Sequence, residues 1–170
     1  HHGILHICEY LEKHHGFEVT YLDVDAEGRV KLDELEKAIK DTTILISIMF
    51  ANNEIGTIQP IKEIGEIAKK HNVLFHTDAV QAAGNVPIDV KELNVDLMSM
   101  SSHKIYGPKG IGALYIKTGT KLHSFVHGGA QERRRRAGTE NMPSIVGYGK
   151  AAELAKTNMD EHIERLTSLR

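Results

Sequence analysis

Segments with two different spacings of hydrophobic residues alternate along this chain. Apolar positions at helical spacing predict four helices, at residues 1–15, 32–39, 61–68 and from 145 to the end. Apolar or alternating runs predict five strands, at residues 17–22, 44–50, 73–76, 95–101 and 112–116. The run at 44–50 is continuously apolar, which is typical of a strand covered on both faces. Because strands and helices take turns, we expect an α/β fold, with a mostly parallel sheet covered by helices.

Polar residues follow three of these predicted strands. Asn52, Asn53 and Glu54 come directly after the run at 44–50. Asp78 follows the strand at 73–76, and the strand at 95–101 runs into Ser101-Ser102-His103-Lys104. In open α/β sheets, ligands bind where parallel strands end at their carboxyl edges. We therefore expect these three segments to meet at one site.

Lys104 and Asp78 have side chains suited to pyridoxal phosphate. A lysine amine can form an imine with the cofactor's aldehyde, and a carboxylate can pair with its ring nitrogen. Each residue also has an ordinary structural interpretation: Lys104 as a solvated surface charge and Asp78 as a helix cap. In the same way, Asn52 and Asn53 could simply form a turn. The glycine–proline turn that begins at Gly107 would fix where the lysine lies.

Composition limits the classes of protein considered. The chain has 170 residues, of which 41% are hydrophobic and 26% charged, which fits one globular domain over residues 1–170. A formal net charge of -2 gives no general attraction to nucleic acid or to an anionic membrane. No apolar run approaches the roughly 20 residues of a membrane helix. The single cysteine, Cys8, cannot form an internal disulfide, so we expect a cytoplasmic location, with Cys8 as a small core residue.

Four segments in a fixed order resemble one enzyme family. They are Ala51-Asn52-Asn53-Glu54-Ile55-Gly56, His76-Thr77-Asp78-Ala79-Val80-Gln81, Ser101-Ser102-His103-Lys104-Ile105-Tyr106-Gly107-Pro108-Lys109-Gly110 and Arg136-Ala137-Gly138-Thr139. Together they resemble the large domain of a cysteine desulfurase, a class V aminotransferase-type enzyme that uses pyridoxal phosphate. The resemblance covers essentially the whole chain. It implies the three-layer sheet of fold-type I pyridoxal-phosphate enzymes.

The resemblance assigns catalytic and ring-binding roles to four residues. Lys104 would bond to the cofactor and later transfer protons as acid and base. Asp78 would keep the pyridine nitrogen protonated, and Gln81 would donate a hydrogen bond to the phenolic oxygen. His1 falls where the family stacks an imidazole over the ring, although the glutamate that precedes it in the family is missing here.

Four further residues match positions that bind phosphate or substrate. Ser101 and His103 would hold the phosphate. Asn53 would contact the cofactor and the substrate carboxylate. Thr139 would reach the phosphate of a neighbouring subunit, which implies a homodimer with shared sites.

The family's reaction converts L-cysteine to L-alanine and leaves a persulfide on an enzyme cysteine. A scaffold or relay protein then accepts the sulfur for iron–sulfur cluster assembly or transfer-RNA thiolation. Cys8 is not at the matching place for that cysteine. The N-terminal phosphate loop, the small C-terminal domain and its carboxylate-binding arginine have no counterpart here either. The resemblance thus implies a domain incomplete at both ends, and we expect the isolated chain to have little or no desulfurase activity.

Several alternatives stay open on sequence alone. Another class V enzyme, such as a selenocysteine lyase or a small-amino-acid aminotransferase, would share the cofactor residues. A non-catalytic remnant would keep only the fold and a dimer surface. From a different class, Asp23, Asp25 and Glu27, with Glu34 as the last ligand, fit a calcium-binding loop. The alternating segment before that loop argues against an entering helix.

Two histidine pairs and an arginine run are further candidate sites. His2 and His6 share a helix face, and His76 shares a strand face with Asp78, but neither pair has a third metal ligand at a recognisable spacing. We therefore predict no metal site. The run from Arg133 to Arg136 is interpreted as an interface or active-site loop rather than a nucleic-acid patch, because the overall charge is negative.

Overall fold

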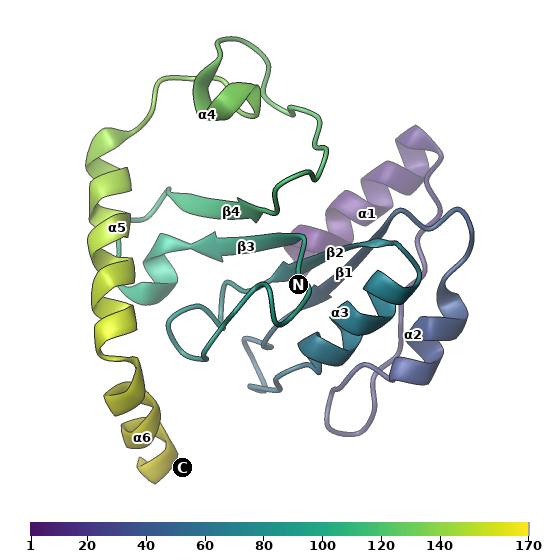
Figure 1. The fold of residues 1–170 in the computed structure, drawn as a ribbon, viewed down its shortest axis with the longest axis horizontal. Helices are drawn as coiled ribbons and strands as arrows, with labels where there is room; N and C mark the ends of the chain where they lie inside the picture. Colours follow the sequence, from purple (N-terminus) through teal and green to yellow (C-terminus); the bar gives the residue numbers. More distant parts are fainter. Residues whose placement is uncertain (170) are drawn as a thin grey trace.

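A four-stranded sheet organises the chain, with helices on both of its faces (Figure 1). The structure is a computed structural model and describes residues 1–169. The helices are α1 (His2–His15), α2 (Leu32–Ala38), α3 (Ile61–Lys70), the short 3-10 helix η1 (Ser102–Ile105), α4 (Gln131–Arg134), α5 (Met142–Thr157) and α6 (Met159–Leu169). The strands are β1 (Leu45–Met49), β2 (Leu74–Asp78), β3 (Leu97–Ser101) and β4 (Gly112–Ile116). The predicted α/β class is confirmed.

The strands lie in the order β1-β2-β3-β4. The first three are parallel, and β4 pairs antiparallel with β3. The register places Met49 opposite Asp78 and Asp78 opposite Ser99. Because β1, β2 and β3 run the same way, their carboxyl ends meet at one edge of the sheet.

The main core lies between this sheet and α3. Apolar residues at helical spacing on α3, including Ile64 and Ala68, turn toward the strands. Ile64 and the strand residue Phe75 are completely buried, each contributing about 1.5–3 kcal/mol of hydrophobic stabilisation. Helix α2 adds Leu35 to the same cluster. This layer holds the strands whose ends carry the predicted site.

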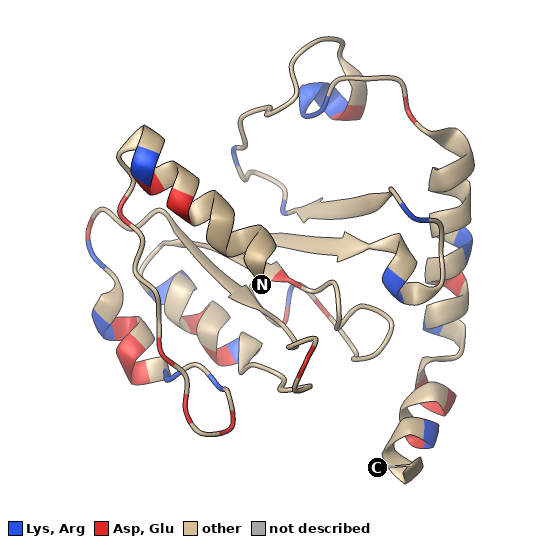
Figure 2. Cartoon of the chain, turned by 180° about the vertical axis from the view of Figure 1, so that it is seen from behind, with Lys and Arg blue, Asp and Glu red and all other residues tan. Residues whose placement is uncertain are grey.

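The opposite face of the sheet is less well covered. Helix α1 lies behind the sheet in Figure 1 and in front of it in Figure 2, yet none of its residues is buried. Leu45 stays 44% exposed on β1, and Leu74 stays exposed on β2. The prediction of a strand covered on both faces is therefore wrong for β1, because α1 does not pack closely along it. Within residues 1–169, no helix is long and apolar enough to cross a membrane.

The predicted strand at 17–22 does not form. Its backbone is tied to α1 instead: Val19 donates its N–H to the Glu12 carboxylate at 3.3 Å. The Tyr21 hydroxyl donates to the same carboxylate at 3.2 Å. An alternating pattern makes a strand only when a neighbouring strand takes its N–H and C=O groups, and this segment has no such neighbour here.

The predicted last helix is in fact two helices. Helix α5 begins at Met142, where the Asn141 side chain accepts the Ser144 N–H at 3.3 Å. It ends before Asn158, and α6 starts at Met159. Asparagine has a low helix propensity because its side chain competes for backbone hydrogen bonds, which explains the break. The apolar periodicity continues across Asn158, so the sequence pattern does not reveal the boundary between α5 and α6.

Candidate active site

The carboxyl edge of β1, β2 and β3 brings three of the predicted segments together. Phe50, directly after β1, donates its N–H to the Asp78 carbonyl at 2.8 Å. Ala79, directly after β2, donates to the Ser99 carbonyl on β3 at 3.0 Å. The three strand ends are thus bonded to one another where their polar side chains emerge.

Asp78 is the last residue of β2 and is half-buried. Its Oδ1 accepts the Val80 N–H at 3.0 Å, so the capping role considered for this residue is partly present. Among the four strands that the structure describes, Asp78 is the only charged residue, and Figure 2 shows the charges gathered on helices and loops. A carboxylate at such a position is costly unless something binds it. Within residues 1–169 it forms no ion pair.

Lys104 lies on η1, which continues directly from β3. Ser102, the first residue of η1, is completely buried and anchors the turn. After η1, Tyr106 adopts a left-handed conformation with φ of 64°. Gly107 lets η1 pack closely against α5, because an added Cβ would meet Ser102 and lie 3.0 Å from the Ala151 Cβ. The Lys104 side chain is exposed and has no ion-pair partner in the described part of the chain.

The predicted phosphate residues also lie at this edge. Ser101 is the last residue of β3, and its Oγ lies 2.8 Å from Nδ1 of His103. Gln81 is half-buried in the turn that follows Asp78. Its backbone carbonyl accepts a hydrogen bond from the Asn85 side chain at 3.0 Å, which holds that turn. A hydroxyl, an imidazole and an amide are suited to bind phosphate and ring oxygens.

Three further predicted residues are Asn53, in the turn after β1, and His1 and Thr139, which lie on other segments. Asn53 is exposed in its turn. Its neighbour Asn52 holds this turn, because the Asn52 side chain accepts the Glu54 and Ile55 N–H groups at 2.8 and 3.0 Å. Asn52 is therefore a turn residue, as the structural alternative proposed. His1 caps α1 by accepting the Gly3 N–H at 3.1 Å.

Thr139 is exposed in the connection between α4 and α5. Helix α4 lies beyond β4 in Figure 1. The described chain places it on a different segment from Asp78 and Lys104. Its assignment to a shared site remains a prediction about a second subunit.

One polar residue on β2 has more hydrogen bonds than the sequence suggested. His76 lies between Ser47 Oγ at 2.8 Å from Nδ1 and Ser99 Oγ at 2.9 Å from Nε2. Burial lowers the pKa of His76, and the nearby Asp78 charge acts in the opposite direction. The signal in the sequence was a serine in the middle of each apolar strand on either side. Alternation alone could not show that both hydroxyls meet one imidazole.

The calcium alternative does not fit the geometry. Asp25 uses its carboxylate to accept the Arg29 and Glu27 N–H groups at 2.8 and 2.9 Å, and these bonds lower the pKa of Asp25. Val24 and Val30 form a bridge that closes the turn, so a helix–loop–helix is absent at this place. Within residues 1–169 no group of three or more acidic, histidine or cysteine side chains is arranged to hold a metal ion.

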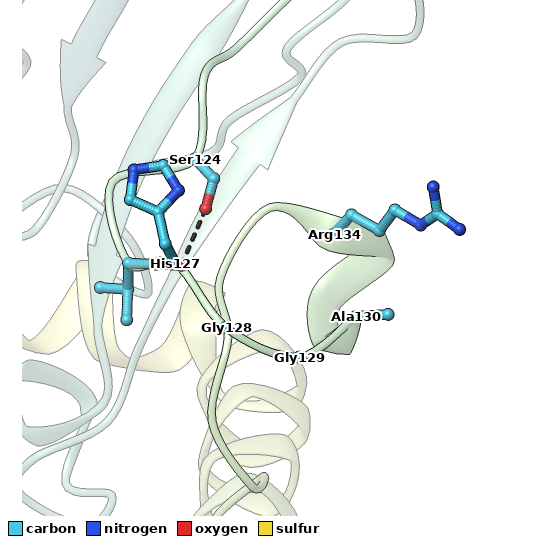
Figure 3. A pocket seen from close by; sticks show the side chains of 7 residues that line it. Ser124, His127, Gly128, Gly129, Ala130 and Arg134 are labelled. Atoms are coloured by element: carbon cyan, nitrogen blue, oxygen red, sulfur yellow. Dashed lines mark hydrogen bonds between the residues drawn. The ribbon is translucent and has the colours of Figure 1, made fainter.

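A separate hollow of about 320 Å³ lies near α4 (Figure 3). It is lined by Ser124, Val126, His127, Gly128, Gly129, Ala130 and Arg134. The Arg134 guanidinium extends away from Ser124 and His127 in Figure 3. Glu132, Arg133 and Arg134 have left-handed φ values of 48°, 57° and 65°, an uncommon run for residues with side chains. No predicted catalytic or cofactor residue lines this hollow.

The residues at the sheet edge match the chemistry that pyridoxal phosphate requires. An exposed amine on Lys104 and a half-buried carboxylate on Asp78 lie at the ends of adjacent parallel strands. Ser101 and His103, just before Lys104 in the sequence, add a hydroxyl and an imidazole. These side chains therefore fit the cofactor: an amine for the aldehyde, a carboxylate for the ring nitrogen, and a hydroxyl with an imidazole for the phosphate.

Comparisons with known proteins identify the family of this chain. The family model described as Aminotransferase class-V matches residues 1–170. A cysteine desulfurase IscS of Methanosarcina thermophila is 66% identical over the whole chain, and one of Clostridium botulinum strain Hall is 63% identical. A solved structure described as a NifS-like protein superposes with a TM-score of 0.93 at 47% identity over 99% of this chain. A second, described as SspA in complex with cysteine, gives 0.87 at 47% identity over 90% of this chain.

These matches cover only part of the related proteins. The chain spans 43% of the Clostridium protein, 42% of the Methanosarcina protein and 47% of the NifS-like structure. The resemblance to cysteine desulfurases is confirmed across every residue of the chain. This chain belongs to the aminotransferase class-V family, whose members use pyridoxal phosphate.

Proposed function

We propose that the intact protein is a pyridoxal-phosphate-dependent cysteine desulfurase and that this chain supplies most of its cofactor site. The observation that carries the proposal is the placement of Asp78 at the end of β2 and of Lys104 on η1, directly after the adjacent parallel strand β3. These strand ends are held together by backbone hydrogen bonds, so the two side chains have a rigid base. The high identity to curated cysteine desulfurases supports this activity over others in the family.

When bound, the cofactor supplies an electron sink for the electrons of a broken substrate bond. Lys104 would hold the aldehyde carbon through its Nζ and, once displaced by substrate, accept or return a proton there. Asp78 would keep the ring nitrogen protonated through its carboxylate. Ser101 and His103 would bind the phosphate, and Gln81 would donate a hydrogen bond to the ring oxygen.

Asn53, His1 and Thr139 would complete the site. Asn53 is exposed beside the strand ends and would bind the carboxylate of L-cysteine. His1, at the start of α1, would stack on the ring. Thr139 would contact the phosphate of a second subunit. A homodimer is supported by apolar exposure near that segment, where Phe125 is 92% exposed and Val146 66% exposed.

Cys8 is a poor candidate for the sulfur-accepting nucleophile. It is half-buried on α1, and burial raises the pKa of its thiol, with the Glu12 and Glu9 charges acting in the same direction. A raised pKa keeps the thiol protonated, whereas the thiolate is the reactive form. We therefore place the persulfide-forming cysteine in a part of the intact protein outside this chain. Its sulfur would pass to a scaffold or relay protein.

The cofactor site is tested by borohydride reduction of the intact protein after incubation with pyridoxal phosphate. We expect visible absorbance that reduction abolishes, with the cofactor mass fixed on Lys104 in the peptide map. The variant Lys104→Ala should lose both signals. Lys109→Ala, which removes an exposed lysine from the following turn, is the matched control and should keep them.

The substrate is tested by supplying L-cysteine and a reductant and measuring sulfide and alanine together. Equal amounts of the two products, lost in Lys104→Ala, would support the desulfurase. Cofactor bound on Lys104 without either product would overturn the choice of cysteine, and selenocysteine or a transamination substrate would then be assayed. Absence of cofactor on Lys104 in the wild-type protein would overturn the whole proposal.

A further inference from the structure

A polar ladder crosses the three parallel strands just before the candidate site. Ser47 lies directly opposite His76 in the β1–β2 register, and Ser99 lies opposite Asp78 in the β2–β3 register. The His76 ring bonds to both hydroxyls, at 2.8 Å on Nδ1 and 2.9 Å on Nε2. Because side chains alternate along a strand, His76 and Asp78 share one face of β2. The ladder and the carboxylate are therefore neighbours.

The ladder suits a neutral imidazole. A neutral ring has one N–H donor and one bare nitrogen acceptor, and a serine hydroxyl can accept from one or donate to the other. Burial lowers the pKa of His76 below its ordinary value of about 6.5, so the neutral form dominates at neutral pH. An apolar residue at this position would remove both hydrogen bonds; the exposed Ser47 hydroxyl could then bond to water, whereas the half-buried Ser99 hydroxyl would be free to turn to a neighbouring acceptor.

Ser99 connects this ladder to the cofactor site. It faces Asp78 across β2 and β3, so its hydroxyl is the natural competitor for that carboxylate. The hydroxyl instead bonds to His76, and within residues 1–169 the Asp78 carboxylate accepts only the Val80 N–H, on Oδ1. The other carboxylate oxygen is left for a donor that arrives from outside the strand.

On the basis of the proposed function, we propose that His76 is a positioning residue for Asp78. By bonding Ser47 and Ser99 at once, His76 fixes the spacing of three strands two residues before the site. In this arrangement Nδ1–H donates to Ser47 and Nε2 accepts the Ser99 hydroxyl proton, so that proton is not donated to Asp78, whose carboxylate oxygen is left for the cofactor's ring nitrogen. His76 acts through Ser99 and Asp78 and does not itself touch the cofactor.

The test uses four forms of the intact protein beside wild type. His76→Leu removes both ring nitrogens, and His76→Gln keeps a terminal donor and acceptor. The double variant His76→Leu with Ser99→Ala also removes the competing hydroxyl. His123→Leu is the matched control, because His123 is exposed in the loop after β4. The affinity for pyridoxal phosphate is measured by titration, and ring-nitrogen protonation by nitrogen NMR with isotopically labelled cofactor.

We expect His76→Leu to bind the cofactor about tenfold more weakly, the worth of about one hydrogen bond to a charged group. Its ring-nitrogen signal should shift toward the deprotonated form. The double variant should recover the protonated signal, because the competing hydroxyl is gone. His76→Gln should stay within about threefold of wild type, and His123→Leu should match wild type. Thermal unfolding of the cofactor-free forms separates these changes from simple loss of stability.

A purely structural role would lower the unfolding temperature of His76→Leu but leave the ring-nitrogen signal of its bound fraction unchanged. That result overturns the inference while the proposed function stands. A double variant no better than His76→Leu also overturns it. If wild-type protein takes up no pyridoxal phosphate, both the proposed function and this inference fail.

Discussion

Gly65 offers a sharp test of how α3 packs against the rest of the molecule. It is a buried glycine in the middle of that helix. A Cβ added there would run into the carbonyl oxygen of Leu93, and would lie 3.1 Å from the Leu93 carbonyl carbon and 3.2 Å from the Asn94 Cβ. Most of these atoms belong to backbone, which cannot rotate away as a side chain can. Gly149 of α5 is the matched control, because a Cβ there meets nothing within 4 Å.

Two opposing effects set the size of the change. Replacing a helical glycine by alanine gains about 1 kcal/mol of helix propensity at either position. At Gly65 the added methyl must also push apart a packed helix and loop, which typically costs about 1–3 kcal/mol and more where backbone must move. Since the Leu93 carbonyl is the obstacle, the upper part of that range applies. We expect Gly65→Ala to be about 2 kcal/mol less stable than wild type and Gly149→Ala up to about 1 kcal/mol more stable.

Urea denaturation of the two variants, followed by far-ultraviolet circular dichroism, measures both changes. A lower midpoint with an unchanged slope for Gly65→Ala would show a loss of stability without a change in the surface exposed on unfolding. A Gly65→Ala variant as stable as wild type, or as stable as Gly149→Ala, would refute the close packing of α3 against the loop before β3.

Three further predictions concern stability and cofactor retention. Asp96→Ala should lower the free energy of unfolding by about 1.5–3 kcal/mol in urea denaturation. The Asp96 carboxylate is only 14% exposed, accepts the Phe75 N–H at 3.0 Å and pairs with the Lys117 amine at 2.8 Å; an unchanged midpoint would contradict this. The pKa of His76 is lower in the folded protein, so the unfolded chain takes up a proton first as the pH falls. The free energy of unfolding should therefore decrease below about pH 6.5, and His76→Leu should lack that part of the pH dependence. Gly107→Ala would press a methyl group into a buried serine hydroxyl and an alanine of α5, shifting η1, and should retain less pyridoxal phosphate after dialysis; wild-type visible absorbance would count against it.

Local patterns in the sequence determined most of the elements. The strand at Gly112–Ile116 was predicted with its observed bounds, and α3 begins directly after Pro60 as expected. These elements follow from short-range effects: proline preceding a helix, and β-branched or apolar runs broken by glycine. The site residues Asp78 and Lys104 were predicted from their places after strands, because parallel strands have a common carboxyl edge.

Tertiary structure decided what local patterns could not. The segment at 17–22 alternates like a strand, but a strand also needs a neighbour for its backbone groups, and Glu12 takes the Val19 N–H instead. The hydrogen bonds of His76 to Ser47 and Ser99 depend on strand order and register, which join residues 29 and 23 positions apart. Composition and spacing thus determine which chemistry the chain carries and at which strand ends. Only the paired sheet decides which carboxylate oxygen is left available, because that depends on which neighbour each hydroxyl meets.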